Sequence, residues 1–197
     1  STQSANYSAA GSVSLVGDLG DTAEPAGGLD VTQISTDHAY TYTSFGGDGG
    51  AITMAGYTNV TVGNLYSYYN NTSVFNGGNI NITRVAGDIH VTGHIKTSAG
   101  NAGDVTMAVE AGSGGSITID GTINLDSATA ASEGDLSLTS DYRIHLASLD
   151  AGLIRNITFN VSDGPAKNWH WVLVESDPLN ITLDGEGKAE GFASVNS

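Results

Sequence analysis

Histidine and carboxylate side chains are the groups in this chain that could hold a metal or transfer protons. His90 and His145 fall at equivalent places in two copies of a repeated phrase, and Thr118 of another copy falls between them. Strands stacked about 4.8 Å apart would separate these two histidines by about 9.6 Å, whereas a bond from zinc to a histidine nitrogen is only about 2.1 Å long. We therefore expect solvated strand histidines that share no metal.

A polysaccharide lyase or hydrolase would need carboxylates and a basic residue gathered on one face. Asp104 and Asp135 each follow a glycine directly, where an aspartate side chain ordinarily shapes a turn. Asp88 and Asp120 flank the repeated phrase on opposite sides. The basic residues are scattered along the chain, at Arg84, Lys96, Arg143, Arg155, Lys167 and Lys188. The sequence therefore predicts that the protein is not an enzyme, and polysaccharide breakdown is the least favoured alternative.

Calcium is the one cofactor that the sequence suggests. Residues 17–21 and 46–50 resemble fragments of the glycine and aspartate repeat that binds Ca²⁺ between the turns of some solenoids. The full nonapeptide never occurs in tandem, so tight turns are the simpler interpretation. Asp18, Asp21 and Asp48 are the weak calcium candidates.

Asparagine sequons offer another kind of chemistry, the attachment of glycans. They are more frequent than chance predicts in a chain of this composition, although alternation itself favours such triplets. The candidate glycosylation sites are Asn59, Asn70, Asn71, Asn81, Asn156, Asn160 and Asn180.

One alternating phrase that would position these side chains recurs every 27 to 29 residues. A second alternating phrase runs ahead of each copy, entered through Gly-Gly-X or Gly-Asp, and a third apolar element follows it. A period of this length, made of strand after strand, is typical of a β-solenoid. The copies of the first phrase are Val60–Val62, Ile89–Val91, Ile117–Ile119 and Ile144–Leu146, those of the second begin at Ile52, Ile80, Val105 and Leu136, and the third lies at Leu65, Ile95, Ile123 and Leu149.

Alternation assigns the aliphatic residues to the core and the residue between them to the outer face. One coil cannot bury its own apolar face, but stacked coils can. The chain has 27 glycines and only 3 prolines, which suits tight corners joined by an unbroken hydrogen-bonded ladder. The sequence therefore predicts an all-β fold, a parallel β-helix or β-solenoid of about five coils with extra terminal strands.

Composition excludes several classes of protein. With 39% hydrophobic and 14% charged residues, the chain is neither a disordered acidic tail nor a membrane protein. No apolar run approaches the roughly 20 residues of a membrane span. A formal charge of −15 argues against nucleic acid as a partner. The lack of cysteine excludes thiolate metal sites and suits an exported protein.

The repeat divides the chain into three segments. Residues 1–28 form an N-terminal strand and loop, 29–164 the parallel β-helix, and 165–197 the C-terminal strands. The first and last segments are expected to act in assembly or as caps. A tyrosine-rich cluster at 66–71 lies inside the β-helix, where it either stacks on carbohydrate or packs as an ordinary tyrosine ladder.

Two apolar stretches outside the repeat are the candidate assembly elements. Val13 and Leu15 alternate within a single strand, and Trp169, Trp171 and Leu173 belong to the most hydrophobic stretch of the chain. Either stretch could lie across the open coil of the next subunit by strand addition. The alternative is that the second stretch folds back and caps its own solenoid.

Three glycine-led phrases resemble a known group of proteins. The phrases begin at Gly77, Gly103 and Gly114 and continue with alternating β-branched residues. They resemble the coils of filamentous-haemagglutinin-type and autotransporter-passenger β-helices over about residues 46–161. The resemblance implies a right-handed coil in a secreted protein at the cell surface or outside the cell, usually structural or adhesive. Those proteins are commonly far longer.

The function expected from these observations is structural. The chain would be a self-associating subunit of an extracellular filament, sheath or surface layer, joined head to tail through its ends, with itself as the main partner. An adhesive or carbohydrate-binding β-helix, with glycans as partners, is the alternative.

Overall fold

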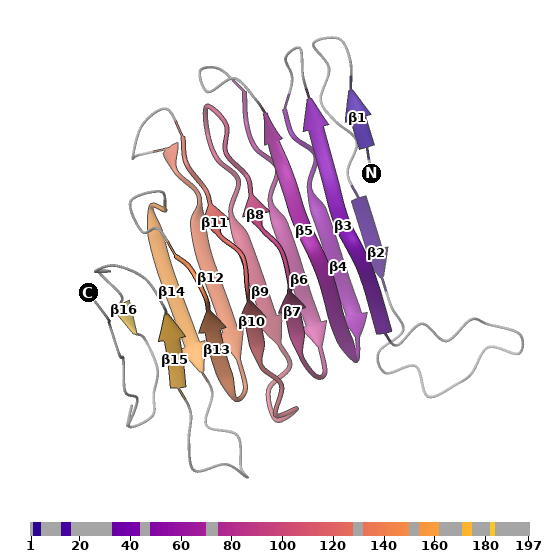
Figure 1. The fold of residues 1–197 in the computed structure, drawn as a ribbon, viewed down its shortest axis with the longest axis vertical. Coiled ribbons are helices and arrows are strands. Elements are labelled where there is room, and N and C mark those ends of the chain that lie inside the picture. Colours follow the sequence, from indigo (N-terminus) through magenta and orange to yellow (C-terminus); the bar gives the residue numbers. More distant parts are fainter. Residues whose placement is uncertain are drawn as a thin grey trace, which may run out of the picture.

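The structure is a computed structural model that describes residues 2–4, 13–16, 33–43, 48–69, 75–127, 132–149, 154–161, 171–174 and 182–183. Within these residues the chain is all-β and contains no α-helix. Figure 1 shows the strands lying side by side, with the first strands at one end of the molecule and the last strands at the other.

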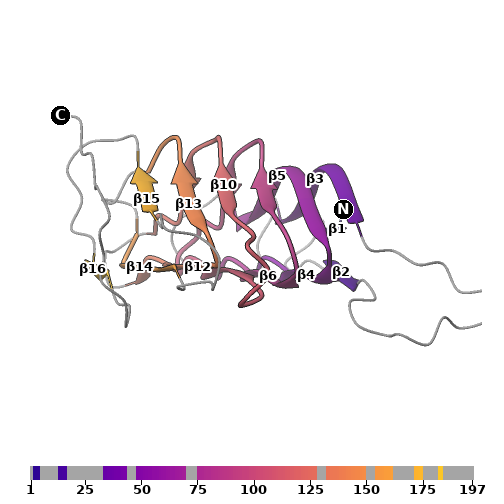
Figure 2. The same ribbon diagram turned by 90° about the horizontal axis from the view of Figure 1, so that it is seen from below.

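Two parallel sheets face each other across the core (Figure 2). The chain passes from one sheet to the other and back in each coil, so neighbouring strands of a sheet belong to successive coils. Sheet A contains, in spatial order, β1 (Thr2–Ser4), β3 (Gln33–Thr43), β5 (Asn59–Tyr69), β7 (Ile89–Val91), β10 (Ile117–Ile119), β13 (Arg143–Leu146) and β15 (Trp171–Val174). Two short strands also belong to this sheet: β8 (Ile95–Lys96) pairs with β5, and β11 (Ile123–Asn124) pairs with β8. Sheet B contains β2 (Val13–Val16), β4 (Ile52–Tyr57), β6 (Ile80–Val85), β9 (Val105–Val109), β12 (Asp135–Ser140), β14 (Asn156–Val161) and β16 (Thr182–Leu183).

The predicted fold class is confirmed, because the chain is a parallel β-solenoid. Ile52, Ile80, Val105 and Leu136 stand in register on four successive strands, so about three turns separate the first from the last. Further strands continue both ladders on either side of these turns. Among these further strands, β2 pairs with β4 and β15 pairs with β13.

Columns of buried aliphatic side chains form the core. Ile117 and Ile119 are both 0% exposed, and each stands in register with its counterparts in the coils on either side. The strands β9, β10 and β12 bury alternate residues, as the sequence pattern predicts. The third apolar element is also present, because Leu65, Ile95 and Ile123 pair in register and are buried.

Stacked glycines set how closely successive coils approach at the corner before sheet B. A Cβ atom on Gly78 would lie 2.3 Å from the carbonyl oxygen of Gly50, and one on Gly103 would lie 2.3 Å from that of Gly78. Gly134 continues the column, with its Cβ position 2.2 Å from the Gly103 carbonyl oxygen. A side chain at these positions would push the coils apart. The glycines that open each repeat are therefore needed for close backbone contact.

A bulge interrupts the regular register of sheet B. Gly56 of β4 and Arg84 of β6 occupy equivalent places and both have a left-handed backbone, with φ of 80° and 55°. Between Ile82 and Val85 the register with β9 shifts, because β9 is one residue shorter there. Glycine adopts this conformation freely, whereas for arginine it costs about 1–2 kcal/mol.

Candidate functional site

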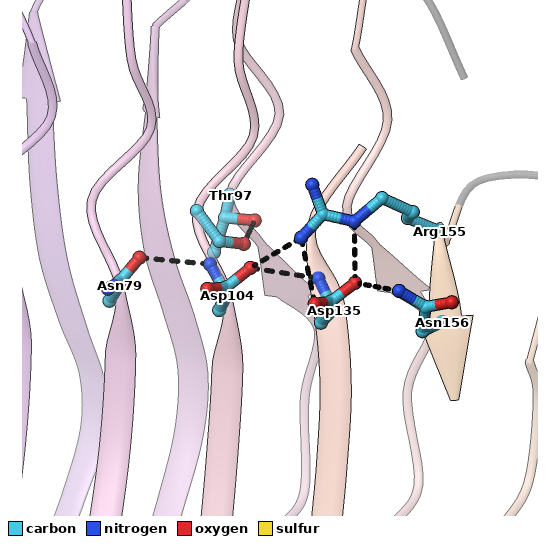
Figure 3. Close-up of polar contacts among 7 residues, drawn as sticks. Asn79, Thr97, Asp104, Asp135, Arg155 and Asn156 are labelled. Carbon is cyan, nitrogen blue, oxygen red and sulfur yellow. Dashed lines mark hydrogen bonds and ion pairs between the residues drawn. The ribbon is translucent and has the colours of Figure 1, made fainter. Parts of the chain in front are cut away.

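Asparagine and aspartate side chains at the entrance to sheet B join successive coils in a hydrogen-bonded ladder (Figure 3). The backbone N–H of Asp104 donates to Asn79 Oδ1 over 3.0 Å, and that of Asp135 donates to Asp104 Oδ1 over 2.9 Å. The first core residue after the corner uses the backbone instead, because the Ile80 N–H donates to the Asp104 carbonyl oxygen over 2.9 Å. At the corner, a side chain of the preceding coil thus supplies the acceptor that the backbone does not.

Two residues of the following coil close this ladder. Arg155 donates from Nε to Asp135 Oδ1 over 2.8 Å and from its terminal nitrogen to Asp135 Oδ2 over 2.7 Å, and Asn156 Nδ2 donates to Asp135 Oδ1 over 2.8 Å. The same Arg155 nitrogen lies 3.9 Å from Asp104 Oδ1. The hydrogen bond from Arg155 is the main reason that the pKa of Asp135 is lowered. The same bond raises the pKa of Arg155. One arginine therefore compensates two carboxylates stacked on neighbouring coils.

The corner before β5, β7 and β10 carries a second ladder of the same kind. Asn59 Oδ1 accepts the backbone N–H of Asp88 over 2.9 Å, and Asp88 Oδ1 accepts that of Ser116 over 2.8 Å. The Asp88 side chain therefore accepts a hydrogen bond from the coil that follows it. Each bond again runs from a backbone N–H to a side chain of the preceding coil.

A third ladder contains a histidine. Asn64 Oδ1 accepts the backbone N–H of His94 over 2.8 Å. His94 Nδ1 then accepts the backbone N–H of Thr122 over 3.1 Å, and the Thr122 hydroxyl lies 2.9 Å from the same nitrogen. A ring nitrogen that accepts a backbone N–H carries no proton, so the proton of the neutral imidazole is on Nε2.

Buried hydroxyl groups bond the glycine column from inside the core. Ser67 Oγ donates to the Gly50 carbonyl over 2.8 Å and accepts the Gly78 N–H over 2.9 Å. One coil later, Thr97 Oγ1 donates to the Gly103 carbonyl over 2.6 Å. Ser67 and Thr97 are both 0% exposed, so these bonds satisfy polar groups that water does not reach.

The histidines lie as the repeat predicted. Thr118 pairs with His90 on one side and with His145 on the other, so the two histidines are two coils apart. The structure adds a contact that sequence reasoning missed, because His90 Nε2 lies 2.7 Å from Asp120 Oδ2. Asp120 follows its strand in the next coil, and the repeat alone could have indicated this proximity.

The carboxylates expected to shape their own turns bond between coils instead. Asp104 and Asp135 accept hydrogen bonds from residues of the following coil, because their side chains point along the solenoid axis at the corner. Among the residues that the structure describes, no group of three or more histidine, cysteine, aspartate or glutamate side chains could hold a metal ion. Asp48, a calcium candidate, accepts the backbone N–H of Asn76 on Oδ1 over 2.8 Å.

The glycosylation candidates that can be placed lie on the outside of the solenoid. Asn156 and Asn160 are exposed on β14, and Asn81 is half-buried on β6. Asn59 is also half-buried, and its amide oxygen belongs to a corner ladder. The other predicted site residues that fall outside the described residues are Asp18, Asp21, Asn70, Asn71, Trp169 and Asn180.

The candidate assembly stretches lie in strands near the two ends of the solenoid. Val13 and Leu15 belong to β2, in register with Ile52 and Met54 of β4. The strand β15, which contains Trp171 and Leu173, pairs with β13 of the same chain. Both stretches thus extend the ladders of their own solenoid.

Two tyrosines of the predicted cluster, Tyr66 and Tyr68, lie on the outer face of β5. Tyr66 and Tyr68 are half-buried and meet edge to face, with ring centroids 6.0 Å apart. Lys96 Nζ of the next coil lies 4.5 Å from the centroid of the Tyr68 ring. On the preceding coil, Tyr40 and Tyr42 of β3 pair in register with Tyr66 and Tyr68. Four tyrosine positions therefore adjoin one another on two strands.

These features define the chain as a parallel β-solenoid whose polar corner residues join the coils. Comparison of the chain with protein-family models, with curated proteins and with solved structures finds no match. Within the described part of the chain, no helix has the length and apolar character to cross a membrane.

Proposed function

We propose that the protein is a structural, self-associating subunit of an extracellular filament, sheath or surface layer. The observation that carries the proposal is the use of the polar corner residues. Asn79, Asp104 and Asp135 each accept hydrogen bonds from the following coil. These polar side chains, which could otherwise have taken part in catalysis, thus form hydrogen bonds that join successive coils. The proposal therefore requires no active site, and the purified protein is expected not to cleave pectin, alginate or similar polysaccharides.

The ends of the two sheets support assembly from head to tail. Within the described residues, β1 and β2 each have one strand neighbour, and so do β15 and β16 at the opposite end. A parallel strand with one free edge can pair with another chain. Contact between opposite ends does not close by two-fold symmetry, so repeated contact generates a filament.

An extracellular site of action is part of the proposal. It is supported by the resemblance of the glycine-led phrases to coils of exported surface β-helices, by the absence of cysteine from the sequence, and by sequons at Asn81, Asn156 and Asn160 on outward strand positions. Glycans at these positions would project from the side of a filament and leave its ends accessible.

Sedimentation and electron microscopy of the full chain test the filament. We expect long, ordered polymers whose mass increases with protein concentration. A double variant, Ser14→Lys with Thr182→Lys, places like charges on the terminal strands β2 and β16, which lie at the two ends of one outer column of sheet B. Like charges opposite each other on paired strands are destabilising, so the double variant should polymerise less.

The control substitution belongs to the same column but to a middle coil. Thr106 pairs with Asn81 on one side and with Ser137 on the other, so Thr106→Lys adds the same charge away from the ends. The control should polymerise like the unmodified chain. Monomers of the unmodified chain at every concentration would refute the filament proposal.

A carbohydrate-binding β-helix is the second candidate, and the tyrosine cluster favours it. Half-exposed rings of Tyr66 and Tyr68 beside the Lys96 ammonium offer stacking and a positive charge to an acidic sugar. Affinity electrophoresis in gels that contain alginate or polygalacturonate tests this function. Retardation that disappears in Tyr68→Ala and persists in Thr118→Ala would support it, and equal mobility in gels with and without polysaccharide would exclude it.

A further inference from the structure

Asn76 and Gly77 form the sole Asn-Gly pair of the sequence. In such a pair, the glycine backbone nitrogen can attack the asparagine side-chain carbonyl carbon, because glycine has no Cβ to hinder the approach. The new bond joins Gly77 N to Asn76 Cγ. The bond from Cγ to Nδ2 breaks, and Nδ2 leaves as ammonia with the proton lost from Gly77. Solvent water then opens the resulting succinimide to aspartate or isoaspartate.

The folded corner holds both reacting groups in hydrogen bonds. The attacking nitrogen, Gly77 N, donates its proton to the Asn101 carbonyl oxygen over 2.8 Å. Asn101 also binds the amide that would be attacked, because Asn101 Nδ2 donates to Asn76 Oδ1 over 2.7 Å. Asn76 and Asn101 also form a parallel bridge between the two coils. Attack by Gly77 N therefore requires that its hydrogen bond to the Asn101 carbonyl oxygen break.

The other side of Asn76 is held by the preceding coil. Its backbone N–H donates to Asp48 Oδ1 over 2.8 Å, and its carbonyl oxygen accepts the Gly49 N–H over 2.7 Å. Asn76 itself is exposed to solvent, so water and hydroxide reach it. Solvent therefore reaches Asn76, while hydrogen bonds join it to the coils on both sides.

We propose that Asn76 is a modification site whose spontaneous deamidation is gated by the contact between its coil and the coil of Asn101. While the coils are joined, Asn76 keeps its amide. When the corner opens, Asn76 converts, and the isoaspartate product routes the backbone through the former side chain. The extra backbone carbon disrupts the register that the Gly49 and Gly77 hydrogen bonds need, so the corner cannot close again as before. The site thus records opening of the solenoid irreversibly.

Peptide mapping by mass spectrometry of the full chain, incubated in mildly alkaline buffer, tests the proposal. Deamidation of Asn76 should be slower in the folded chain than in concentrated urea by about tenfold or more, because the reactive open state is rarely populated. Asn101→Ala removes the side-chain hydrogen bond and should accelerate deamidation of Asn76 several-fold in buffer. Asn160→Ala is the control, because Asn160 is an exposed asparagine on β14, away from the corner of Asn76.

Asn101→Asp provides a second variant of similar size. It places an acceptor opposite Asn76 Oδ1, so the holding bond is lost while the volume is kept. Circular dichroism and sedimentation establish that each variant is folded before rates are compared. Equal rates in buffer and urea would overturn the proposal. So would rates unchanged from the native chain in both folded Asn101 variants.

Discussion

His94 Nδ1 accepts the backbone N–H of Thr122 over 3.1 Å, and so an imidazole does in one ladder what carboxylate and amide oxygens do in the others. This relationship predicts which replacements the position tolerates. His94→Asn retains an acceptor and should leave the urea midpoint of unfolding close to that of the native chain. His94→Ala removes it and should cost about 0.5–1.5 kcal/mol. Equal stability of the two variants would contradict the assigned role.

Ile117 and Thr118 are adjacent residues of β10 that face opposite sides of the sheet. Ile117 is 0% exposed, and Ile117→Asp would bury a charge among stacked aliphatic side chains. We expect this variant not to fold, as measured by circular dichroism. The milder Ile117→Ala should cost about 2–5 kcal/mol in urea unfolding. Thr118→Asp, on the half-buried outer position, should fold and should cost far less.

Gly78 and Gly112 should respond to alanine for different reasons. A Cβ on Gly78 would meet the Gly50 carbonyl oxygen at 2.3 Å, so the coils would have to separate, at a cost of about 1–3 kcal/mol or more. Gly112 has open space around it but a φ of 79°, so Gly112→Ala should cost only about 1–2 kcal/mol. Thermal unfolding of the two variants measures the difference. A Gly112→Ala variant that is the less stable of the two would contradict it.

The pair of Asp135 and Arg155 should make stability depend on acid. The hydrogen bond from Arg155 lowers the pKa of Asp135 in the folded chain. The contribution of this hydrogen bond to the free energy of unfolding is therefore fully present above the pKa of an aspartate in the unfolded chain, about 3.9. It is lost as the pH falls through the lowered pKa of Asp135 in the folded chain. Both side chains are substantially exposed, so the contribution is small. The difference in unfolding free energy between the native chain and Asp135→Asn should shrink across this acid range. A difference that is constant with pH would contradict the assignment.

The core was predictable from sequence because alternation and period act together. Ile117 can lie inside the coil only if Thr118 lies outside, and a fixed period places Ile89 and Ile144 beside Ile117. The corner ladders were not predicted. An aspartate after glycine, such as Asp104, fits a local turn as well as a bond to the next coil, and only the stacking of coils decides between them. Asn59, Asp88 and Ser116 do recur before successive copies of one phrase, which was the signal available.

The end strands were ambiguous for a related reason. The pattern of Val13–Val16 fits a rung of the same solenoid and a strand added to another copy equally well, because both partners offer the same ladder. The structure pairs this stretch with β4 of its own chain. Local sequence could not distinguish the two partners, since they differ in connectivity and not in chemistry.

In the three corner ladders described above, the bonds from a backbone N–H to a side-chain acceptor share one direction. In each ladder the later coil gives the N–H and the earlier coil gives the side-chain acceptor, as Asp104 does to Asn79 and Ser116 does to Asp88. A coil that has already wound therefore offers a ready template to the chain that follows it. A polypeptide that emerges from a ribosome or a secretion pore with its N-terminus first can wind in the order in which it appears. Each completed coil thus presents side-chain acceptors for the backbone N–H groups of the coil that forms after it.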